Sequence, residues 1–419
     1  MVIKWIRLEN DGKTARSVCG IDENVLTEDG MRTEEKEVFF SVASEYADYL
    51  VTERCDAYVV VLIRYALEKG YNIRSLVPMS EDLCYNITEH LLPPMVKNGR
   101  YNVRLEVETA PPLPGGSAVG TGASCGVDSL HAIRKYKDYP VANYRITHLC
   151  MYDVGAFNGI YDLTGPEEAK EKIYARSRVV AAELGLPLIE TGSNIYGSFK
   201  LNYLYSHDFY SAFAIFCLKK LWKHYYYASE GVDYVSGFSL KDYLHNDSAA
   251  YETLLFDCLS TSTLRIYSEG STLTRFEKID NISDYPVARK HLFSCTYSGD
   301  NCSRCDKCTR NILALDTLGK LDDFSEVYDV EFYRTHKYRY MWYLHSRSTN
   351  HYFEPIFKAF KEKDDEEFQR IGELARRVKK FDALWERNDR AADKKAVELL
   401  QPYELSDVHV ALRMAKAYA

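Results

Sequence analysis

The sequence lacks several features that would each define a class of protein. No apolar run approaches the roughly 18 residues that a membrane-spanning helix needs, and AYVVVLI covers only residues 57–63. The opening MVIKWIRLENDGKTARS carries charge where a signal peptide would be apolar, so we expect no export signal. Positive charge is not in excess, since the net charge is −8. This argues against bulk nucleic-acid binding. Internal repeats and low-complexity tracts are also absent, which favours an ordinary soluble globular protein.

Cysteine, in contrast, is plentiful. The chain has 11 cysteines and no apparent export signal, so we expect a reducing compartment and a cytoplasmic protein. Four of the cysteines lie within residues 295–308, a clustering that favours metal ligation over a disulfide scaffold. The 34 tyrosines are also numerous and are compatible with a tyrosine-rich core or with a homodimer or partner-protein interface.

The pattern along the chain predicts three blocks. Residues 1–114 form an α+β block with a strand near 2–8, helices over 34–52 and 56–70, and a strand over 101–110. The punctuating PPLPGG at 111–116 ends this block. Residues 115–313 alternate short apolar runs with helical stretches, and residues 314–419 are charged and helical in period.

The middle block is typical of an α/β fold. We predict strands over 147–155, 186–192 and 232–238, and helices over 167–185 and 210–229. Strands that alternate with long helices predict a doubly wound parallel sheet. Ligands of such sheets bind at the carboxyl ends of the strands, where this chain places glycines and polar residues.

A candidate phosphate loop opens this block. The stretch ASCGVDS, residues 123–129, joins small residues to the start of an apparent helix, and Gly126 lets a ligand approach the backbone. Backbone N–H groups at a helix N-terminus attract anions. No Gly-Lys-Ser/Thr follows, so it is not a Walker A loop. The bland alternative is a turn in which Asp128 or Ser129 only caps the helix.

The cysteine cluster is the more specific signal. Cys295, Cys302, Cys305 and Cys308 are separated by six, two and two residues. Four such thiolates can close a tetrahedral Zn²⁺ site. An iron–sulfur cluster is the rival interpretation, but its common motif places the fourth cysteine downstream and follows it with proline. Unrelated buried thiols are the remaining alternative.

Two motifs together resemble a known family. The Ser-x-Gly-x-Asp-Ser of residues 124–129 is similar to the Ser-Gly-Gly-x-Asp-Ser loop of PP-loop ATP pyrophosphatases. Followed by the four-cysteine spacing, it resembles the 7-cyano-7-deazaguanine synthase family. MYDVGAFNG, RVVAAELGLPLIE, EGVDYVSGFSLKDY and GSTLTRFEKI resemble further segments of that family in the same order. The resemblance covers about residues 117–313, with departures at Cys125 and Ala156, where the family has glycine and glutamine.

The resemblance implies a PP-loop domain that uses ATP and Mg²⁺ to adenylate a carboxylate such as 7-carboxy-7-deazaguanine. Ammonia or another amine, including a protein amine, then attacks. It also implies zinc at the four cysteines. It assigns Ser124 and Asp128 to catalysis, and it places the ATP against these and the other loop and strand-end residues: Cys125, Gly126, Val127, Ser129, Tyr152 and Gly155.

Other polar residues are weaker candidates for a functional site. His207 and Asp208 open a helix, where Asp208 is either a cap or functional. Lys241 and Asp242 follow the predicted strand 232–238, Arg275 and Lys278 either hold phosphate or lie on a solvated helix face, and His131 fits a helix surface. Two other functions stay open. One is nucleotide sulfuration through a persulfide at Cys125 or Cys150, and the other is a non-catalytic binding or assembly module.

Overall fold

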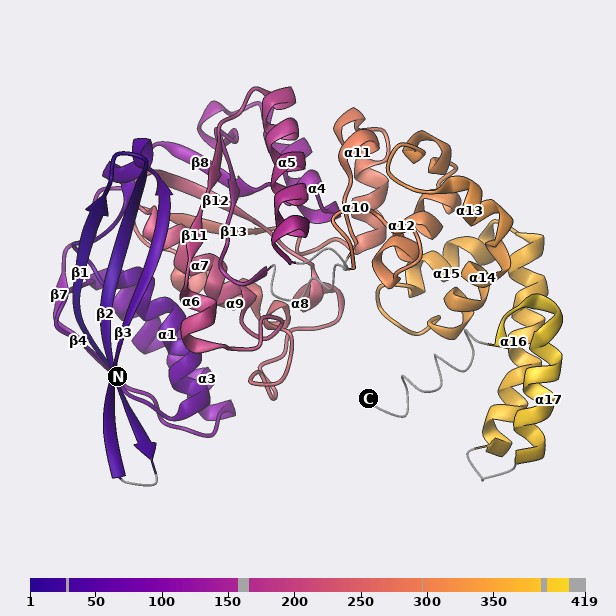
Figure 1. The fold of residues 1–419 in the computed structure, drawn as a ribbon, viewed down its shortest axis with the longest axis horizontal. Coiled ribbons are helices and arrows are strands. Elements are labelled where there is room, and N and C mark those ends of the chain that lie inside the picture. Colours follow the sequence, from indigo (N-terminus) through magenta and orange to yellow (C-terminus); the bar gives the residue numbers. More distant parts are fainter. Residues whose placement is uncertain (28–29, 157–165, 296, 386–389, 407–419) are drawn as a thin grey trace. The chain divides into compact units, whose positions relative to one another are not determined.

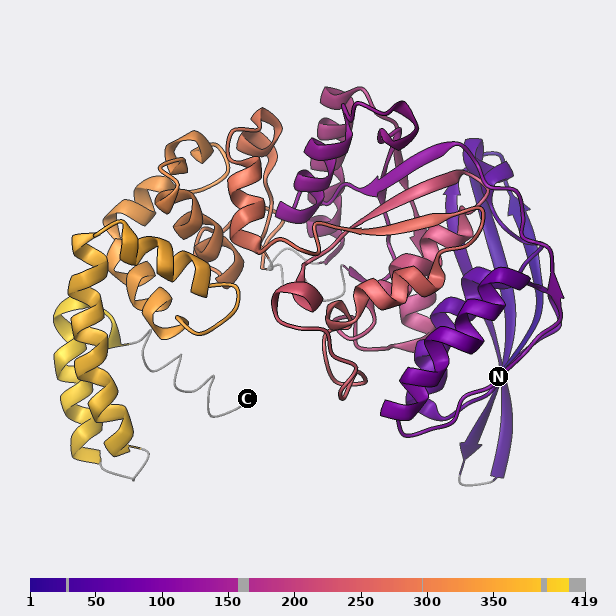
Figure 2. The same cartoon turned by 180° about the vertical axis from the view of Figure 1, so that it is seen from behind.

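The computed structural model describes residues 1–27, 30–156, 166–295, 297–385 and 390–406. Contacts between residues divide the chain into two compact units (Figures 1 and 2). The first comprises residues 1–278 and 291–299, and the second comprises residues 279–290 and 300–419. The N-terminal block therefore shares one compact unit with most of the block that follows it.

A six-stranded mixed sheet forms the N-terminal part of the first unit, in the order β11-β3-β2-β1-β4-β6. Its centre is antiparallel, because β2 pairs with both β1 and β3. Strands β4 and β6 extend one edge in parallel, and β11 pairs antiparallel with β3 at the other. The bounds are β1 Val2–Asn10, β2 Thr14–Thr27, β3 Gly30–Ala43, β4 Ile73–Ser75, β6 Leu105–Glu106 and β11 Gly192–Ser193.

One predicted helix of this region is wrong. Residues 34–43 belong to β3, which pairs with β2, and only a 3-10 turn follows at Ser44–Tyr49. Val38, Phe40 and Val42 alternate into the core, so the apolar period is that of a strand. The second predicted helix is confirmed as α1, Asp56–Lys69. The predicted strand 101–110 is reduced to β6 and to β7 (Thr109–Ala110), which pairs in parallel with β5 (Met79–Ser80).

Short helices complete this N-terminal region. The segment after β5 is helical from Glu81 to Asn98 and ends before Gly99. It contains α2 (Glu81–Asn86), a π-helical turn (Ile87–Leu91) and α3 (Leu92–Asn98).

A five-stranded, fully parallel sheet follows, in the order β10-β9-β8-β12-β13. The predicted parallel sheet is therefore confirmed. Helices α4 and α5 pack on one face, and α7 and α9 lie on the other, as right-handed crossovers require (Figures 1 and 2). The strands are β8 Ala118–Gly122, β9 His148–Met151, β10 Leu188–Glu190, β12 Trp222–Ala228 and β13 Arg265–Glu269. The helices are α4 Val127–Tyr136, α5 Pro166–Leu184, α6 Ile195–Phe199, α7 His207–Cys217, α8 Val232–Val235 and α9 Glu252–Leu259.

Two further predictions in this sheet are wrong. Residues 210–229 do not form one helix, because α7 ends at Cys217 and Trp222–Ala228 is the strand β12. Aromatic side chains favour strands, and β12 lies between β8 and β13. The predicted strand 232–238 contains the short helix α8 instead, which begins after Gly231 in the left-handed conformation (φ 78°).

One hydrophobic core joins the two sheets of the first unit. Helix α1 is buried along most of its length and packs against α7. The ring of Phe213 on α7 contacts both Tyr58 on α1 and Phe40 on β3, at centroid distances of 5.4 and 5.8 Å. The N-terminal sheet and α1 thus pack against α7, one of the helices on the face of the parallel sheet.

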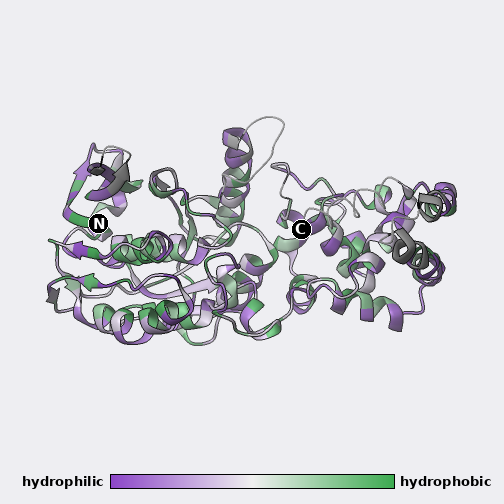
Figure 3. Ribbon diagram, turned by 90° about the horizontal axis from the view of Figure 1, so that it is seen from below, coloured by the Kyte–Doolittle hydropathy of each residue, from purple (hydrophilic) through white to green (hydrophobic). Residues whose placement is uncertain are grey.

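The described part of the second unit is helical. Helices α14 and α17 each pack against α16, and α12 packs against α15. Most of them carry both hydrophobic and hydrophilic residues (Figure 3). The bounds are α12 Asp306–Thr317, α13 Val330–Thr335, α14 Lys337–Ser346, α15 Glu354–Glu362, α16 Glu366–Trp385 and α17 Arg390–Leu400. Preceding them in sequence are α10, Arg275–Ile282, which begins in the first unit, and α11, Pro286–His291.

Candidate functional site

The strand order of the parallel sheet marks the place where a ligand would bind. The chain runs from β8 outward through β9 to β10, and then returns to the other side of β8 with β12 and β13. The switch point therefore lies between β8 and β12, and a crevice outside their carboxyl ends is the usual ligand site of such sheets. The loop of residues 123–126 leaves β8 at this point.

The loop after β8 presents an uncapped helix N-terminus. Helix α4 begins at Val127, and its N-cap residue Gly126 supplies no side-chain hydrogen bond. Ser124 Oγ donates to Ser129 Oγ at 3.2 Å, and Ser129 Oγ donates to the Gly126 carbonyl at 3.1 Å. The alternative in which Asp128 or Ser129 caps the helix is wrong, because neither occupies the capping position. The first-turn N–H groups of α4 thus remain suited to an anion.

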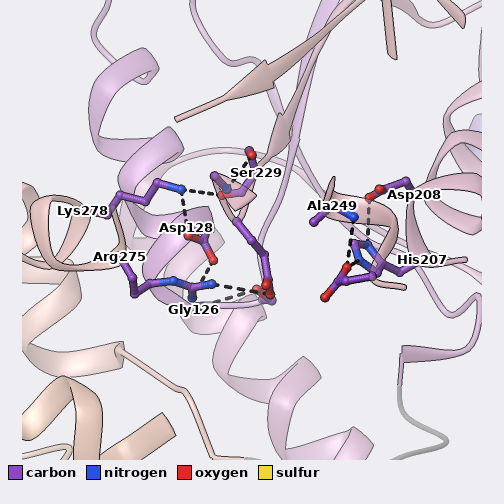
Figure 4. A network of polar contacts seen from close by, with 12 residues as sticks. Gly126, Asp128, His207, Asp208, Ser229, Ala249, Arg275 and Lys278 are labelled. Carbon is purple, nitrogen blue, oxygen red and sulfur yellow. Dashed lines mark hydrogen bonds and ion pairs between the residues drawn. The ribbon is translucent and has the colours of Figure 1, made fainter. Parts of the chain in front are cut away.

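Two cations converge on Asp128 in this loop (Figure 4). Arg275 Nη1 lies 2.7 Å from Asp128 Oδ2, and Lys278 Nζ lies 3.2 Å from Asp128 Oδ1. Lys278 also donates to the Ser229 carbonyl at 2.6 Å, directly after β12. Arg275 Nη2 approaches Glu230 at 3.5 Å.

These two cations come from one helix face. They are three residues apart on α10, and their side chains are only 9% and 0% exposed. A solvated helix face, one of the two interpretations of Arg275 and Lys278, is therefore wrong. Asp128 and Glu230 balance these two cations, and the side chain of Glu230 is 34% exposed.

Cys125 has a backbone conformation that glycine favours, and glycine is the residue of the PP-loop motif at this position. Its φ is 58°, in the left-handed region that glycine favours. The side chain is fully buried, with Sγ 3.5 Å from the Ala123 carbonyl and interacting with Ser177 on α5. Burial raises the pKa of the Cys125 thiol to about 11. The thiol is thus part of the packing between the loop and α5.

The remaining predicted nucleotide residues follow β9, the neighbour of β8. The Tyr152 ring stacks on Tyr225 of β12 at 5.9 Å, and burial raises the pKa of Tyr152 well above its usual value. Gly155 has φ 121°, and a Cβ there would lie 2.7 Å from the Tyr196 ring and 3.1 Å from that of Tyr203. Glycine is therefore required at 155, and it brings the backbone close to these rings. Ala156 has an exposed side chain.

The four predicted metal cysteines come together. The sulfur atoms of Cys295, Cys302, Cys305 and Cys308 all lie within 4.8 Å of one another, so the set could hold a metal ion. The Cys305 N–H points to Cys302 Sγ at 3.2 Å, and the Cys308 N–H points to Cys305 Sγ at 3.4 Å. The Tyr297 N–H points to Cys295 Sγ at 3.4 Å. Such N–H···S contacts stabilise thiolates and orient them as ligands.

A second polar cluster lies at the end of β12 (Figure 4). His207 Nδ1 is 2.8 Å from Asp208 Oδ1, and His207 Nε2 is 3.0 Å from Asp247 Oδ1. Tyr227 Oη of β12 is 2.9 Å from His207 Nδ1. Burial alone would lower the pKa of His207, but Asp208 and Asp247 outweigh it and hold that pKa well above the usual value. His207 is thus a buried cation, and the interpretation of Asp208 as only a helix cap is wrong.

Other candidates lie elsewhere. Lys241 is exposed, and exposed Asp242 pairs with His245 at 2.7 Å, as loop charges do. His131 is buried, with Nε2 3.7 Å from Glu269 at the end of β13. Sequence reasoning did not select Asp247, Glu252 or Ser229. Only Ser229 directly follows a strand, and that strand, β12, lies inside a predicted helix. Asp247 precedes a 3-10 turn and Glu252 begins α9, so no strand end indicates them.

Comparison of the chain with protein-family models, curated proteins and solved structures finds no match. Among the described residues, no helix has both the length and the apolar character to cross a membrane. The features that bear on function are the geometry of the switch point and that of the cysteine cluster.

Proposed function

We propose that this protein is an ATP-dependent, AMP-forming enzyme that activates a carboxylate and transfers it to an amine. The observation that carries the proposal is the uncapped N-terminus of α4 at the switch point, beside the buried Arg275 and Lys278. The resemblance of residues 124–129 to PP-loop ATP pyrophosphatases supports ATP as the anion. The acid that the resemblance suggests is 7-carboxy-7-deazaguanine.

The reaction has two steps. A carboxylate oxygen attacks the α-phosphorus of ATP, the bond between the α- and β-phosphates breaks, and pyrophosphate leaves with its electron pair. An amine nitrogen then attacks the acyl carbon, AMP leaves, and the amine loses a proton. The first step needs stabilisation of the negative charge on the leaving group, which preorganised N–H groups and fixed cations supply.

Different residues of the site bind the phosphates and stabilise the leaving group. The N–H groups of Val127, Asp128 and Ser129 bind phosphate oxygens, and Ser124 offers its hydroxyl. Arg275 and Lys278 stabilise the departing pyrophosphate. Asp128, which they hold in place, would be the residue that binds Mg²⁺, and the ion would shield the charge of the triphosphate. The backbone after β9, near Tyr152 and Gly155, borders the nucleotide at the adjacent strand end.

Zinc is the metal that we propose for the cysteine cluster. Four thiolate donors close together are the ligand set of structural zinc, which leaves no open position for catalysis. The described backbone N–H···S contacts fit that role.

Nucleotide sulfuration is disfavoured by the two thiols that it would use. Burial raises the pKa of Cys125 to about 11 and that of Cys150 to about 12, so both are protonated at neutral pH. A persulfide carrier needs a reactive, accessible thiolate. A non-catalytic nucleotide-binding module is kept as an outcome of the test.

The test is product analysis with Mg-ATP, 7-carboxy-7-deazaguanine and ammonia. AMP and pyrophosphate that appear only when the acid is present are expected, and Lys278→Met is expected to abolish them. Lys241→Met, at an exposed lysine between α8 and α9, is the matched control and should retain activity. Tight ATP binding without AMP, for this acid and for a panel of other carboxylates, would contradict the enzyme and indicate the binding module.

A further inference from the structure

The cluster around His207 has more carboxylates than cations. Asp208 and Asp247 flank His207, and Glu252, the first residue of α9, lies near enough to Asp208 to interact with it. Asp208 and Glu252 are both fully buried. Burial, followed by repulsion from Asp208, raises the pKa of Glu252 well above its usual value. The cluster thus has three carboxyl groups and one imidazolium, so Glu252 ionises only when a further positive charge lies beside it.

Several buried polar atoms of the cluster have no hydrogen-bond partner among the described residues. Glu252 Oε1 accepts from Ser268 Oγ of β13, but its Oε2 has none. Tyr251 interacts electrostatically with Arg64 and then with Asp208 and Asp247, so it lies near the cluster. Buried groups of this kind are nearly always satisfied, by protein, water or a ligand. The unpartnered atoms on fully buried residues of the cluster or next to it in sequence are Ser206 Oγ, Asp208 Oδ2, Ser248 Oγ, Tyr251 Oη and Glu252 Oε2.

The cluster also adjoins the phosphate loop. Ser229 follows β12, its carbonyl accepts from Lys278, and its side chain lies near Glu252. Tyr227, two residues earlier, contacts His207. Lys278 and the cluster therefore meet the same end of β12, so a group bound in the cluster lies on the same sheet edge as the loop.

We propose that the residues His207, Asp208, Asp247 and Glu252 form the acceptor subsite, which binds a primary ammonium group next to the activated acid. This assignment rests on the proposed function. The unpartnered oxygens are hydrogen-bond acceptors, and an ammonium group offers three or four N–H donors and one positive charge, which the cluster lacks. Asp247, whose side chain is 26% exposed, is the member through which an amine enters from solvent.

The cluster also receives the proton that the amine loses. The acceptor binds as R–NH₃⁺, gives one proton to a carboxylate of the cluster, and attacks the acyl carbon through its free electron pair. A C–N bond forms, the C–O bond to AMP breaks, and the attacking nitrogen releases a second proton to solvent. No oxidant or further reactant is needed.

Binding is measured first, without reference to turnover. Thermal unfolding of the full-length protein is compared in ammonium, methylammonium, potassium and tetramethylammonium chloride at equal ionic strength. Ammonium and methylammonium should raise the midpoint above tetramethylammonium, and Glu252→Gln should lose that increment. A larger shift with methylammonium indicates an amine-bearing molecule, and a larger shift with ammonium indicates ammonia. An equal effect of potassium, or no difference among the salts, would overturn the subsite, leaving a metal cation or water in the cluster.

Kinetics then separate this subsite from the proposed function. In Asp247→Asn and Glu252→Gln, the KM for ammonia should rise at least tenfold, while ATP–pyrophosphate exchange driven by the acid continues. Asp242→Asn, at an exposed carboxylate of the neighbouring loop, is the matched control. Absence of acid-dependent exchange in the wild-type protein would contradict the proposed function. The ammonium-dependent stabilisation would then still test the subsite. Unchanged KM values in both variants would refute the subsite alone.

Discussion

The left-handed conformation of Cys125 predicts an unusual order of stability among substitutions in the phosphate loop. A non-glycine residue at φ 58° carries about 1–2 kcal/mol of backbone strain. Replacing Cys125 with alanine removes the buried sulfur but keeps that strain. Replacing it with glycine also removes a methylene, at a cost of about 0.8 kcal/mol, but relieves the strain.

The Cys125→Gly variant should therefore be about as stable as the Cys125→Ala variant, or more stable. Glycine also loses about 0.5–1 kcal/mol through the greater freedom of the unfolded chain. Together these terms place Cys125→Gly within about 0.5 kcal/mol of Cys125→Ala, whereas an ordinary buried Ala→Gly change costs more than about 1 kcal/mol. Urea unfolding of both variants measures the difference. A glycine variant less stable than the alanine variant by over ~1 kcal/mol would refute the left-handed backbone.

ATP affinity in the same variants tests where the thiol points. Since Cys125 Sγ packs against Ala123 and Ser177, removing it should change the Kd of ATP less than about threefold, or under ~0.7 kcal/mol. Isothermal titration of the wild-type and glycine proteins checks this. Tightening of more than tenfold would show that the thiol obstructs the phosphates and would refute the packing described above.

Three other predictions follow from single sites. Gly155→Ala should destabilise the fold by about 2 kcal/mol or more, because φ 121° and the Tyr196 ring at 2.7 Å exclude a Cβ, and an unchanged melting temperature would contradict it. Burial would raise the pKa of Glu269, but contacts from His131, Lys135 and Tyr136 lower it from 4.5 to about 2. The stabilisation, on the order of 3 kcal/mol, is thus present above pH 4.5 and lost as the pH falls toward 2, and pH-dependent unfolding of Glu269→Gln should lack this loss. Metal analysis should find one zinc per chain and none in Cys308→Ser, and retention of zinc by that variant would contradict a four-thiolate site.

Local spacing carried the parts of the site that could be predicted from sequence. The loop of residues 123–129 and the cysteines between 295 and 308 are short segments in which neighbours in sequence are neighbours in space. Long, regular segments such as α5 were also identified correctly. Of the strands of the parallel sheet, β9 and β10 match predicted strands, whereas β12 lies in a predicted helix and β13 is not among the predictions.

The errors occurred where tertiary packing decides the structure. The aromatic run of β12 continues the period of α7 without a glycine or proline, so the sequence shows no boundary between helix and strand. The second half of the site depends on contacts that no local pattern encodes. Lys278 reaches Asp128 across 150 residues of sequence, and Asp247 reaches His207 across 40.

A structure of the protein with Mg²⁺ and α,β-methylene-ATP, which cannot be cleaved between those phosphates, tests the phosphate loop most directly. We expect the triphosphate at the N-terminus of α4, with oxygens on the N–H groups of Val127–Ser129 and within reach of Arg275 and Lys278. Nucleotide bound away from this loop, or no nucleotide at millimolar concentration, would contradict it.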